Sequence, residues 1–434
     1  MTRSIFSILI SIILVTGSLH VNGQMKSLRL IEQSINALNE VLIHDITSPP
    51  VASRTYAYSL IAFYEGGRNA DKSYNSFGGK LNGLEQLPVP APGESVDYVI
   101  SGLTAFYVTA NALVFSKKMF DDQWKPLADQ ISKMKIDNTV RQRSVEYGKK
   151  IAEEIIKWSK QDQYANTRGL AKYTPSRTPG SWQQTAPDFM EAIEPYWNQL
   201  RPMVIKGTDQ FLIPPPCAFD SEKFKQDCKE VYETGLNLSR EQKAIADFWD
   251  CNPFATQTVG HMMYSVKKIS PAGHWIGITG VAIKKNKEEF IPALRQYSLV
   301  AIAIYDAIIC AWDEKYRSNY IRPVTAIQQF HSPTWQPHLQ TPPFPEYPSG
   351  HSVISNAAAT ILTHFFGGNF KFTDDVEKPY GLPVKTFPSF FYAADEAAIS
   401  RLYGGIHFRE AIENGKIMGR NVGASVLNKL EVNN

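Results

Sequence analysis

Residues 348–366, PSGHSVISNAAATILTHFF, join a helix start to a long apolar helical segment. Ser349 is a favoured N-cap residue, and the Ala-rich run from His351 to Phe366 has the composition of a buried helix. The backbone amides of Gly350 and His351 would then point out of the helix N-terminus. A helix start of this kind favours an anion. The segment therefore predicts both a helical core and an anion site.

Two further blocks of sequence supply positive charge. Lys315 stands seven positions before Arg322, and Arg401 stands six positions before His407. The proline after Arg322 favours a helix boundary at that arginine, and a Gly-Gly pair between Arg401 and His407 favours a tight turn. Together the blocks offer three positive charges, a hydroxyl, a free amide and two imidazoles. These groups are suited to holding a tetrahedral oxyanion and to proton chemistry beside it.

The three blocks, K-x-x-x-x-x-x-R-P, P-S-G-H and S-R-x-x-x-x-x-H, resemble a known signature. It is shared by vanadium-dependent haloperoxidases and type 2 phosphatidic-acid phosphatases, and all three blocks match in order. The likeness extends through the helical pattern from about Ser53 to the C-terminus. The resemblance implies an all-α fold of two packed helical bundles.

The resemblance also implies a role for each motif residue. The residues that would bind the oxygens of vanadate or phosphate are Lys315, Arg322, Ser349, Gly350 and Arg401. His407 would be the direct ligand of vanadium, and His351 would be the acid-base residue. Lys315 would also polarise an oxygen of the bound peroxide, so Lys315, His351 and His407 are the catalytic candidates. Vanadium would act as a Lewis acid.

Peroxidase and phosphatase share this cradle, so its neighbours must separate them. Trp312 and Phe344 match aromatic residues that line the halide side of the pocket in chloroperoxidase-like and iodoperoxidase-like members. The alternative is that both are ordinary aromatic residues of the hydrophobic core. The resemblance favours a vanadium-dependent haloperoxidase that uses hydrogen peroxide to oxidise iodide or bromide, rather than chloride, with small organic molecules as halogen acceptors.

Two other functions are compatible with the motifs. One is a secreted acid phosphatase, in which His407 would be the nucleophile that forms a phosphohistidine and His351 the acid for the leaving group. The other is a non-catalytic oxyanion-binding protein, which would require a lost catalytic group. None of the motif residues is missing.

The N-terminus has the pattern of a signal peptide. Arg3 precedes an apolar run from Ile5 to Val15 and then small and polar residues, which predicts a signal peptide over residues 1–23 and export to the periplasm or beyond. The longest later apolar run, Tyr297 to Trp312, is interrupted by Asp306 and predicts a buried helix rather than a membrane span. The net charge of +3 gives no case for nucleic acid, and no pattern indicates an oligomeric state.

The four cysteines are sparse and lack any C-x-x-C spacing, so they predict no metal site. In an export compartment Cys217 and Cys228 could form a disulfide, whereas Cys310 lies in the apolar run and is expected to be a buried thiol. The remaining histidines lack ligand-like spacing. Packed or surface positions are expected for His261, His274, His331, His338 and His364.

Most apolar segments repeat with a period near 3.6, and sustained strand alternation is absent. The organisation predicts an N-terminal bundle over 24–235 and a C-terminal bundle over 236–434 that carries the oxyanion site. The expected helices are Met25–His44, Ser53–Gly66, Val96–Phe115, Thr139–Lys160, Arg240–Trp249, Pro292–Asp313, Val324–Phe330, His351–Phe366, Phe391–Tyr403 and Phe408–Leu430.

Two features stand out from this pattern. Residues 173–217 are rich in proline and predict an extended loop that wraps the helices and shapes the pocket entrance. Residues 54–65 align without gaps with residues 295–306, and each segment begins with arginine and ends with tyrosine followed by an acid. This faint repeat predicts two related bundles packed against each other.

Overall fold

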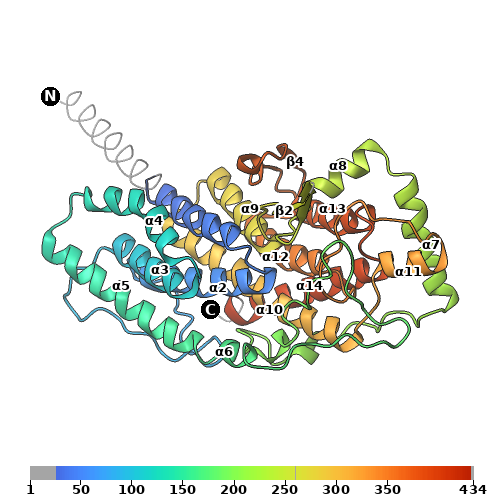
Figure 1. Ribbon diagram of the computed structural model, residues 1–434. Coiled ribbons are helices and arrows are strands. Elements are labelled where there is room, and N and C mark those ends of the chain that lie inside the picture. The colour runs from blue at the N-terminus through green and yellow to red at the C-terminus, as the bar shows by residue number, and fades with distance from the viewer. Residues whose placement is uncertain (1–25, 260, 432–434) are drawn as a thin grey trace.

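The computed structural model describes residues 26–259 and 261–431, and helices dominate it (Figure 1). The helices of the N-terminal half are residues 26–44, α2 (Pro49–Gly67), α3 (Tyr98–Leu113), α4 (Lys117–Ser132), α5 (Asn138–Ser159) and α6 (Tyr164–Thr167). Those that follow are α7 (Glu222–Leu236), α8 (Arg240–Phe248), α9 (Pro271–Asn286), α10 (Phe290–Ser318), α11 (Pro323–Phe330), α12 (Gly350–Phe366), α13 (Phe390–Tyr403) and α14 (Arg409–Leu430). The predicted signal peptide lies outside the described residues.

The described chain contains little else that is regular. The short 3-10 helices are η1 (Arg68–Ala70), η2 (Trp197–Gln199), η3 (Thr208–Phe211) and η4 (Lys378–Tyr380). The strands are β1 (Thr256–Val259), β2 (Met262–Ser265), β3 (Phe372–Asp374) and β4 (Lys385–Phe387). They form two antiparallel hairpins, with Thr256 opposite Ser265 and Phe372 opposite Phe387. The all-α prediction is confirmed.

The helices form two bundles that meet along two long buried helices. α2, α3 and α5 pack together in one bundle, and α10, α12, α13 and α14 pack together in the other. α2 lies against α10, so these two helices form the seam in the middle of the molecule (Figure 1). α7 lies at the far end of the second bundle, where it contacts α11 and α13.

The helix boundaries show what the sequence pattern detects. α11 begins at Pro323 with Arg322 as its N-cap, as predicted. α10 is longer than predicted and ends only at Asn319, which adopts the left-handed conformation with φ 46°, so Lys315 lies in its last turn. α4, α6, α7 and α9 were not predicted. α4 contains an internal proline and α9 contains three glycines, features that lower helix propensity until packing overrides them.

The predicted repeat has a structural counterpart in two buried arginines. Arg54 on α2 reaches the end of α5, where it donates to the carbonyl of Ser159 at 2.9 Å and to Asp162 at 2.7 Å. Arg295 on α10 reaches the end of α14, where it donates to the carbonyl of Leu430 at 2.8 Å and to Glu431 at 2.5 Å. Each arginine therefore caps the final helix of its own bundle.

The acids at the other end of the repeat also have matching roles. Glu65 accepts a hydrogen bond from the backbone amide of Phe77 at 2.6 Å. Asp306 accepts from the amides of residues 203, 204 and 205 at 2.7–3.1 Å. Both carboxylates are fully buried, and each ties a loop to the core helix of its bundle. Equivalent positions in the two segments therefore have the same structural role, which is to anchor a loop to a core helix.

Glycines on α14 let it approach α12 closely. A Cβ atom at Gly419 would lie 2.2 Å from the carbonyl oxygen of Val353, and one at Gly415 would lie 3.0 Å from the carbonyl oxygen of Ser349. Since real Cβ atoms do not approach so closely, only glycine permits this contact. The N-terminal turn of α12 is therefore held against α14 by backbone packing.

The proline-rich segment 173–217 contains no α-helix and runs over α10 and the loop before α12. The amide of Trp182 donates to the carbonyl of Asn319 at 2.8 Å, and the amide of Ile193 donates to that of Pro343 at 3.1 Å. The segment wraps the helices as predicted. It contributes no side chain to the pocket described below, so it supports the pocket from behind instead of shaping its entrance.

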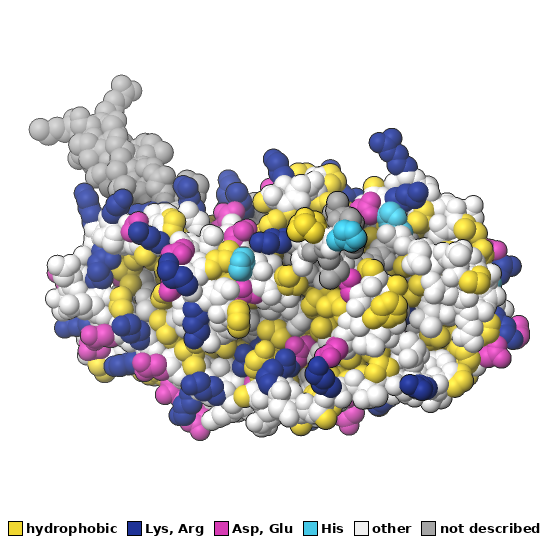
Figure 2. Space-filling view, viewed as in Figure 1, with side chains coloured by type: hydrophobic (Ala, Val, Ile, Leu, Met, Phe, Trp, Pro, Cys, Tyr) yellow, Lys and Arg dark blue, Asp and Glu magenta, His cyan; other side chains and the backbone are white. Residues whose placement is uncertain are grey.

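The surface and the cysteines add two observations. Figure 2 shows basic and acidic side chains interspersed over the visible face. Among the described residues, one helix, Phe290–Ser318, is long and apolar enough to cross a membrane, and its apolar part is fully buried inside the protein. The disulfide that Cys217 and Cys228 could form is not present: both thiols are free, and the sulfur of Cys217 lies 3.2 Å from the hydroxyl of Tyr320. Cys310 is a buried thiol, as expected.

Candidate active site

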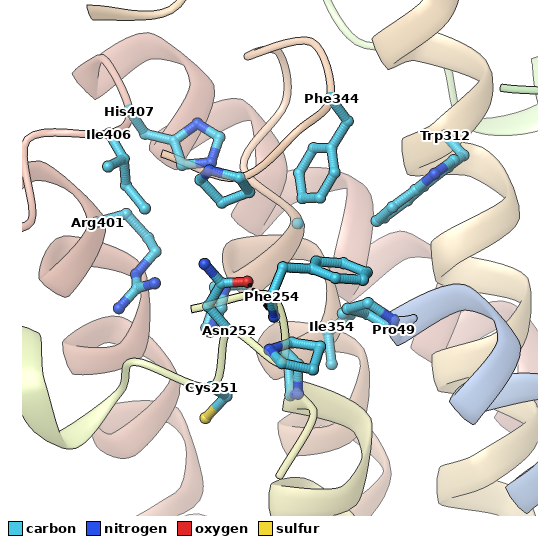
Figure 3. Close-up of a pocket in the computed structure, with 15 residues that line it drawn as sticks. Pro49, Cys251, Asn252, Phe254, Trp312, Phe344, Ile354, Arg401, Ile406 and His407 are labelled. Carbon is cyan, nitrogen blue, oxygen red and sulfur yellow. Dashed lines mark hydrogen bonds between the residues drawn. The ribbon is translucent and has the colours of Figure 1, made fainter. Parts of the chain in front are cut away.

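Two of the three sequence blocks line one pocket, through Gly350, His351, Arg401 and His407, and Arg322 of the first block lies directly behind His407. Figure 3 shows Arg401 and His407 on one side of it and Phe344 and Trp312 on the other. The residues that line it are Pro49, Cys251, Asn252, Pro253, Phe254, Pro271, Trp312, Pro342, Phe344, Gly350, His351, Ile354, Arg401, Ile406 and His407. The pocket therefore has a cationic side and an apolar side.

Arg322 is fully buried next to His407. Its Nε donates to the carbonyl of Phe344 at 2.9 Å, and its NH1 donates to the carbonyl of Ile406 at 2.8 Å and lies 3.2 Å from Nε2 of His407. NH2 is buried without a protein partner. Burial lowers the pKa of Arg322 to about 10, so the guanidinium remains charged at neutral pH. It is a fixed cation with one free donor group.

Arg401 lies in the last turn of α13 and is held from the opposite side. Its NH2 donates to the carbonyl of Trp249 at 2.8 Å, and its Nε donates to the hydroxyl of Ser400 at 3.1 Å. The chain turns sharply after α13, with Gly405 at φ +74°, and returns His407 to the same pocket. The predicted tight turn is confirmed.

The start of α12 provides the hydrogen-bond donors of the site. Ser349 is the N-cap, as predicted, and its hydroxyl accepts from the amide of Ser352 at 3.4 Å. Gly350 follows as the first helical residue and borders the pocket. The helix begins at Gly350, one residue earlier than predicted. The first amides of a helix have no partner within the helix, so those of α12 are available at the pocket.

His407 is paired with a carboxylate that sequence analysis did not single out. Nδ1 of His407 lies 2.8 Å from Oε1 of Glu346, and the same oxygen accepts from the amide of Phe408 at 2.9 Å. Burial lowers the pKa of His407 well below its usual value, and Arg322 and Lys315 lower it further. Burial raises the pKa of Glu346 to about 8. No local sequence pattern indicates that Glu346 is the partner of His407, because the two residues are 61 positions apart.

Lys315 lies beneath the cradle and does not line the pocket. Its ammonium donates to the carbonyl oxygens of Pro345, Glu346 and Pro348 at 3.0, 3.0 and 2.5 Å. All three N–H donors of the side chain are thus directed at the loop that leads into α12. Burial and the neighbouring Arg322 lower the pKa of Lys315 well below its usual value.

His351 completes the polar side of the pocket. Its Nε2 is buried without a protein partner. Burial lowers the pKa of His351 well below its usual value, and the charge of Arg401 lowers it further. A neutral imidazole in this position has a nitrogen free to accept a proton.

Comparisons with known proteins agree with this geometry. The chain is 43% identical to a protein whose structure is described as the first bacterial vanadium-dependent iodoperoxidase, with a TM-score of 0.87 over 93% of this chain and 97% of that one. The chain belongs to the vanadium-dependent haloperoxidases. A family model described as "VCPO second helical-bundle domain" matches residues 295–433, which include every motif residue.

Other haloperoxidases are more distant. The vanadium chloroperoxidase of Curvularia inaequalis is 25% identical over 166 residues, and the match spans 26% of this chain and only 27% of that protein. The holo-type bacterial vanadium-dependent chloroperoxidase is 16% identical, with a TM-score of 0.63 over 92% of this chain and 93% of that one. The apo-type structure is 17% identical, with a TM-score of 0.64 over 89% and 94%. These likenesses show the shared fold.

The donor set of this haloperoxidase fits a vanadate ion. Arg401, the first amides of α12 and a neutral imidazole line the polar side of the pocket, with Arg322 behind His407, and NH2 of Arg322 and Nε2 of His351 lack protein partners. Unpaired buried polar atoms are costly, so these two atoms indicate a bound group. A tetrahedral oxyanion offers four acceptors to such a set.

The apolar side of the pocket in this haloperoxidase contains the two predicted aromatics. The rings of Trp312 and Phe344 lie 5.1 Å apart, inclined at 49°. Nε1 of Trp312 donates to the carbonyl of Ile193 at 3.2 Å, so the polar atom of the indole is already paired with the proline-rich segment. An apolar aromatic surface therefore faces the pocket.

Sequence analysis missed the segment that lies between the two sides of the pocket. Figure 3 shows Asn252 and Phe254 between the arginine and the aromatic pair. Oδ1 of Asn252 accepts from the amide of Phe254 at 3.1 Å, which fixes the amide group, while Nδ2 is buried without a partner. A single asparagine in a loop carries no sequence pattern that would reveal this donor.

Proposed function

We propose that this haloperoxidase binds vanadate in the cradle and oxidises iodide with hydrogen peroxide. The observation that carries the proposal is the convergence of buried Arg401, the start of α12 and two neutral imidazoles on one pocket, with buried Arg322 directly behind His407. When bound, vanadate supplies a Lewis-acidic centre that activates peroxide without a change of oxidation state.

The residues of the chain have distinct proposed roles. Arg322 and Arg401, with Ser349 and the amide of Gly350, would hold the negative oxygens. Nε2 of His407 would be the direct ligand, since its other nitrogen is already paired with Glu346. His351 would accept a proton from hydrogen peroxide and return it to the leaving oxygen.

For Lys315 we propose two roles. Its contacts with three carbonyls hold the loop 345–348 in place beneath the cradle. Its positive charge, where present, would also draw electron density from the oxygen that is transferred to the halide.

Iodide is the proposed halide for two reasons. The 43% identical relative is an iodoperoxidase by description. The pocket also presents Trp312, Phe344 and Phe254 beside Nδ2 of Asn252, a largely apolar surface with one N–H donor. Such a surface suits a large, weakly hydrated anion better than a small, strongly hydrated one. Hypoiodous acid would leave toward small organic acceptors.

Reconstitution tests the proposal. Vanadate-free protein should gain iodide oxidation when orthovanadate is added, with lower rates for bromide and chloride, and phosphate should compete with vanadate because both are tetrahedral oxyanions. Hydrolysis of a phosphate ester is measured in parallel. Efficient hydrolysis with no vanadate-dependent oxidation would assign the cradle to a phosphatase instead.

We further propose that residues 1–23 direct export. The support is the sequence pattern of one early arginine, an apolar run and small residues. N-terminal sequencing of protein recovered from the periplasm or medium should begin near Gln24. Recovery of the full chain from the cytoplasm would contradict the proposal.

A further inference from the structure

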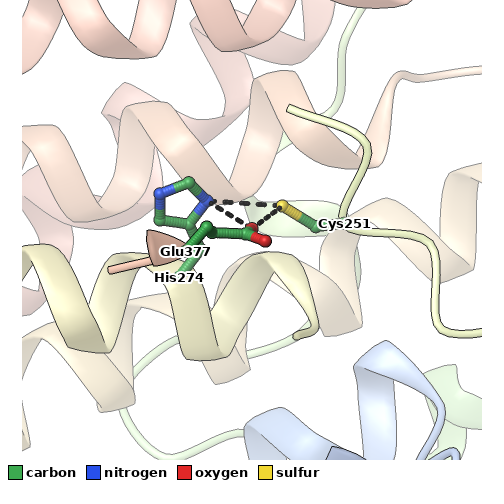
Figure 4. A group of neighbouring side chains, drawn as sticks. All are labelled: Cys251, His274 and Glu377. Carbon is green, nitrogen blue, oxygen red and sulfur yellow. Dashed lines mark hydrogen bonds and ion pairs between the residues drawn. The ribbon is translucent and has the colours of Figure 1, made fainter. Parts of the chain in front are cut away.

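We propose that Cys251, His274 and Glu377 form a binding site for a divalent cation of the zinc class, separate from the vanadate cradle. Figure 4 shows the thiol, one imidazole nitrogen and a carboxylate oxygen turned toward one another. The residues come from the segment after α8, from α9 and from the turn before η4. All three are at most 3% exposed.

The spacing of the three donor atoms fits a metal. The sulfur of Cys251 lies 3.4 Å from Nδ1 of His274 and 3.3 Å from Oε1 of Glu377, and Nδ1 lies 3.2 Å from that oxygen. Tetrahedral zinc with bonds of about 2.0–2.3 Å separates its ligand atoms by about 3.3–3.6 Å. A zinc ion could therefore bind with little movement of the side chains, and a fourth position would remain for water or the second oxygen of Glu377.

The outer face of His274 has the arrangement found behind zinc-binding histidines. Its Nε2 lies 2.8 Å from Oδ2 of Asp374, and the other oxygen of Asp374 accepts from the amide of Val376 at 3.1 Å. The indole of Trp249 stacks on the imidazole at 4.8 Å. A metal-binding histidine commonly donates its second N–H to a carboxylate, which turns the remaining lone pair toward the metal.

Protons compete with the metal for the same atoms. Burial lowers the pKa of His274, but Asp374 and Cys251 raise it above its usual value overall. Burial raises the pKa of the Cys251 thiol to about 12. In the metal-free protein a proton on Nδ1 and a proton on the thiol can both be directed at Glu377. Metal binding requires a deprotonated thiol and a free Nδ1 lone pair, so it should release protons.

The position of the site indicates what the metal would do. Cys251 borders the active-site pocket, and Asn252 follows it directly. The carbonyl of Trp249, two residues earlier, accepts the hydrogen bond from Arg401. A metal at Cys251 would fix the loop that carries these groups, and it would not take part in peroxide chemistry.

Metal binding is tested on vanadate-free protein, so the outcome does not depend on the oxidation reaction. Protein stripped with a chelator is titrated with Zn²⁺ and with Co²⁺ alone. One equivalent of zinc should bind with release of protons, and cobalt should give the near-ultraviolet absorption of a cobalt–thiolate bond. Cys251→Ser should remove that absorption, and His274→Gln should weaken zinc binding at least tenfold. Cys228→Ser, which changes another buried thiol, is the matched control.

The wild-type protein alone can overturn the proposal, even where a variant does not fold. Substoichiometric zinc after titration, or cobalt bound without thiolate absorption, would assign the cluster to a hydrogen-bonded imidazolium. A cobalt spectrum that is the same in wild type and Cys251→Ser would also overturn it.

Discussion

Oε1 of Glu346 lies 2.8 Å from Nδ1 of His407, and both side chains are buried beside the start of α12. When the proton of a neutral His407 is on Nδ1, its Nε2 lone pair faces the pocket and NH1 of Arg322, 3.2 Å away. The ionised carboxylate of Glu346 can only accept from Nδ1, so in that form it selects the tautomer that a metal ligand needs. Glu346 acts through His407, which makes it a positioning residue.

Replacing this carboxylate should weaken the cofactor site. Glu346→Gln is expected to lower vanadate affinity by about 10–100-fold, the usual effect of losing an outer partner of a metal ligand. Calorimetric titration with vanadate measures this, and Glu230→Gln, a surface acid that pairs with Arg409, is the control. Unchanged affinity would show that His407 is oriented without Glu346.

The same pair predicts a pH dependence of stability in the vanadate-free protein. Burial raises the pKa of Glu346 from 4.5 to about 8, and it lowers those of His351 and His407 below 6.5. Well above pH 6.5 both histidines are neutral whether folded or unfolded, while Glu346 keeps its proton up to about pH 8 only in the folded state. Between about pH 7 and 8 the folded protein holds this extra proton, so Glu346 should lower the free energy of unfolding as the pH rises.

Denaturant unfolding at intervals across this range measures the slope. Glu346→Gln cannot titrate and should lose the part of the slope that Glu346 contributes, while Glu314, whose pKa burial raises to about 7, still titrates in the variant. A variant with the same slope as wild type would assign the effect to other groups.

Substitutions of the two motif histidines should have different effects on vanadate binding and on turnover. His407→Ala is expected to abolish vanadate binding, because it removes the direct ligand. His351→Ala should retain vanadate and lose about a hundred- to ten-thousand-fold in kcat, the usual contribution of general acid-base catalysis. Vanadium content and iodide oxidation are measured together, with surface His338→Ala as the control. Equal loss of vanadium in both variants would contradict this division.

Lys315 should contribute to stability as well as to turnover. Lys315→Met keeps the apolar volume and leaves three buried carbonyls without their donor, so the free energy of unfolding should fall by about 1.5–3 kcal/mol. Iodide turnover should fall by a larger factor than vanadate affinity. Unfolding, vanadate titration and steady-state oxidation are compared with Lys416→Met, a lysine outside the pocket. If stability is unchanged, the carbonyl contacts do not hold the loop.

Asn252 should affect halide binding in a charge-dependent way. Asn252→Ala removes one N–H donor and should raise the KM for iodide by about tenfold, a typical hydrogen-bond contribution. Asn252→Asp places an acceptor carboxylate there and should raise it further. Steady-state kinetics on vanadate-saturated enzyme measure both, with Asn237→Ala, directly after α7, as the control. Equal KM values for Asn, Ala and Asp would exclude Asn252 from the halide site.

Sequence reasoning found the parts of the site that have a local cause. Ser349 is a cap before an apolar run, and Arg322 precedes a proline, so each position could be inferred from a few adjacent residues. Contacts between distant segments were not accessible in this way. Glu346 meets His407 across 61 residues, and Cys251 meets Glu377 across 126, with no spacing that marks either pair.

The prediction of helices shows the same difference between local sequence patterns and contacts between distant segments. Long apolar segments such as α10 and α12 were found because their period is strong. α9 was missed, because its glycines lower helix propensity while they allow close packing against neighbours such as Val376 and Tyr297. The local composition disfavours that helix, and tertiary contacts stabilise it.

The glycine contacts between α14 and α12 have a consequence for how this enzyme can change. Gly415 and Gly419 place the turn that carries Ser349 by main-chain contact, so the helix start of the oxyanion cradle is fixed by atoms that most substitutions leave untouched. The opposite wall consists of side chains such as Asn252, Phe254 and Phe344. Under the proposed roles of these groups, single substitutions in the wall would change halide preference while the start of α12 keeps its place.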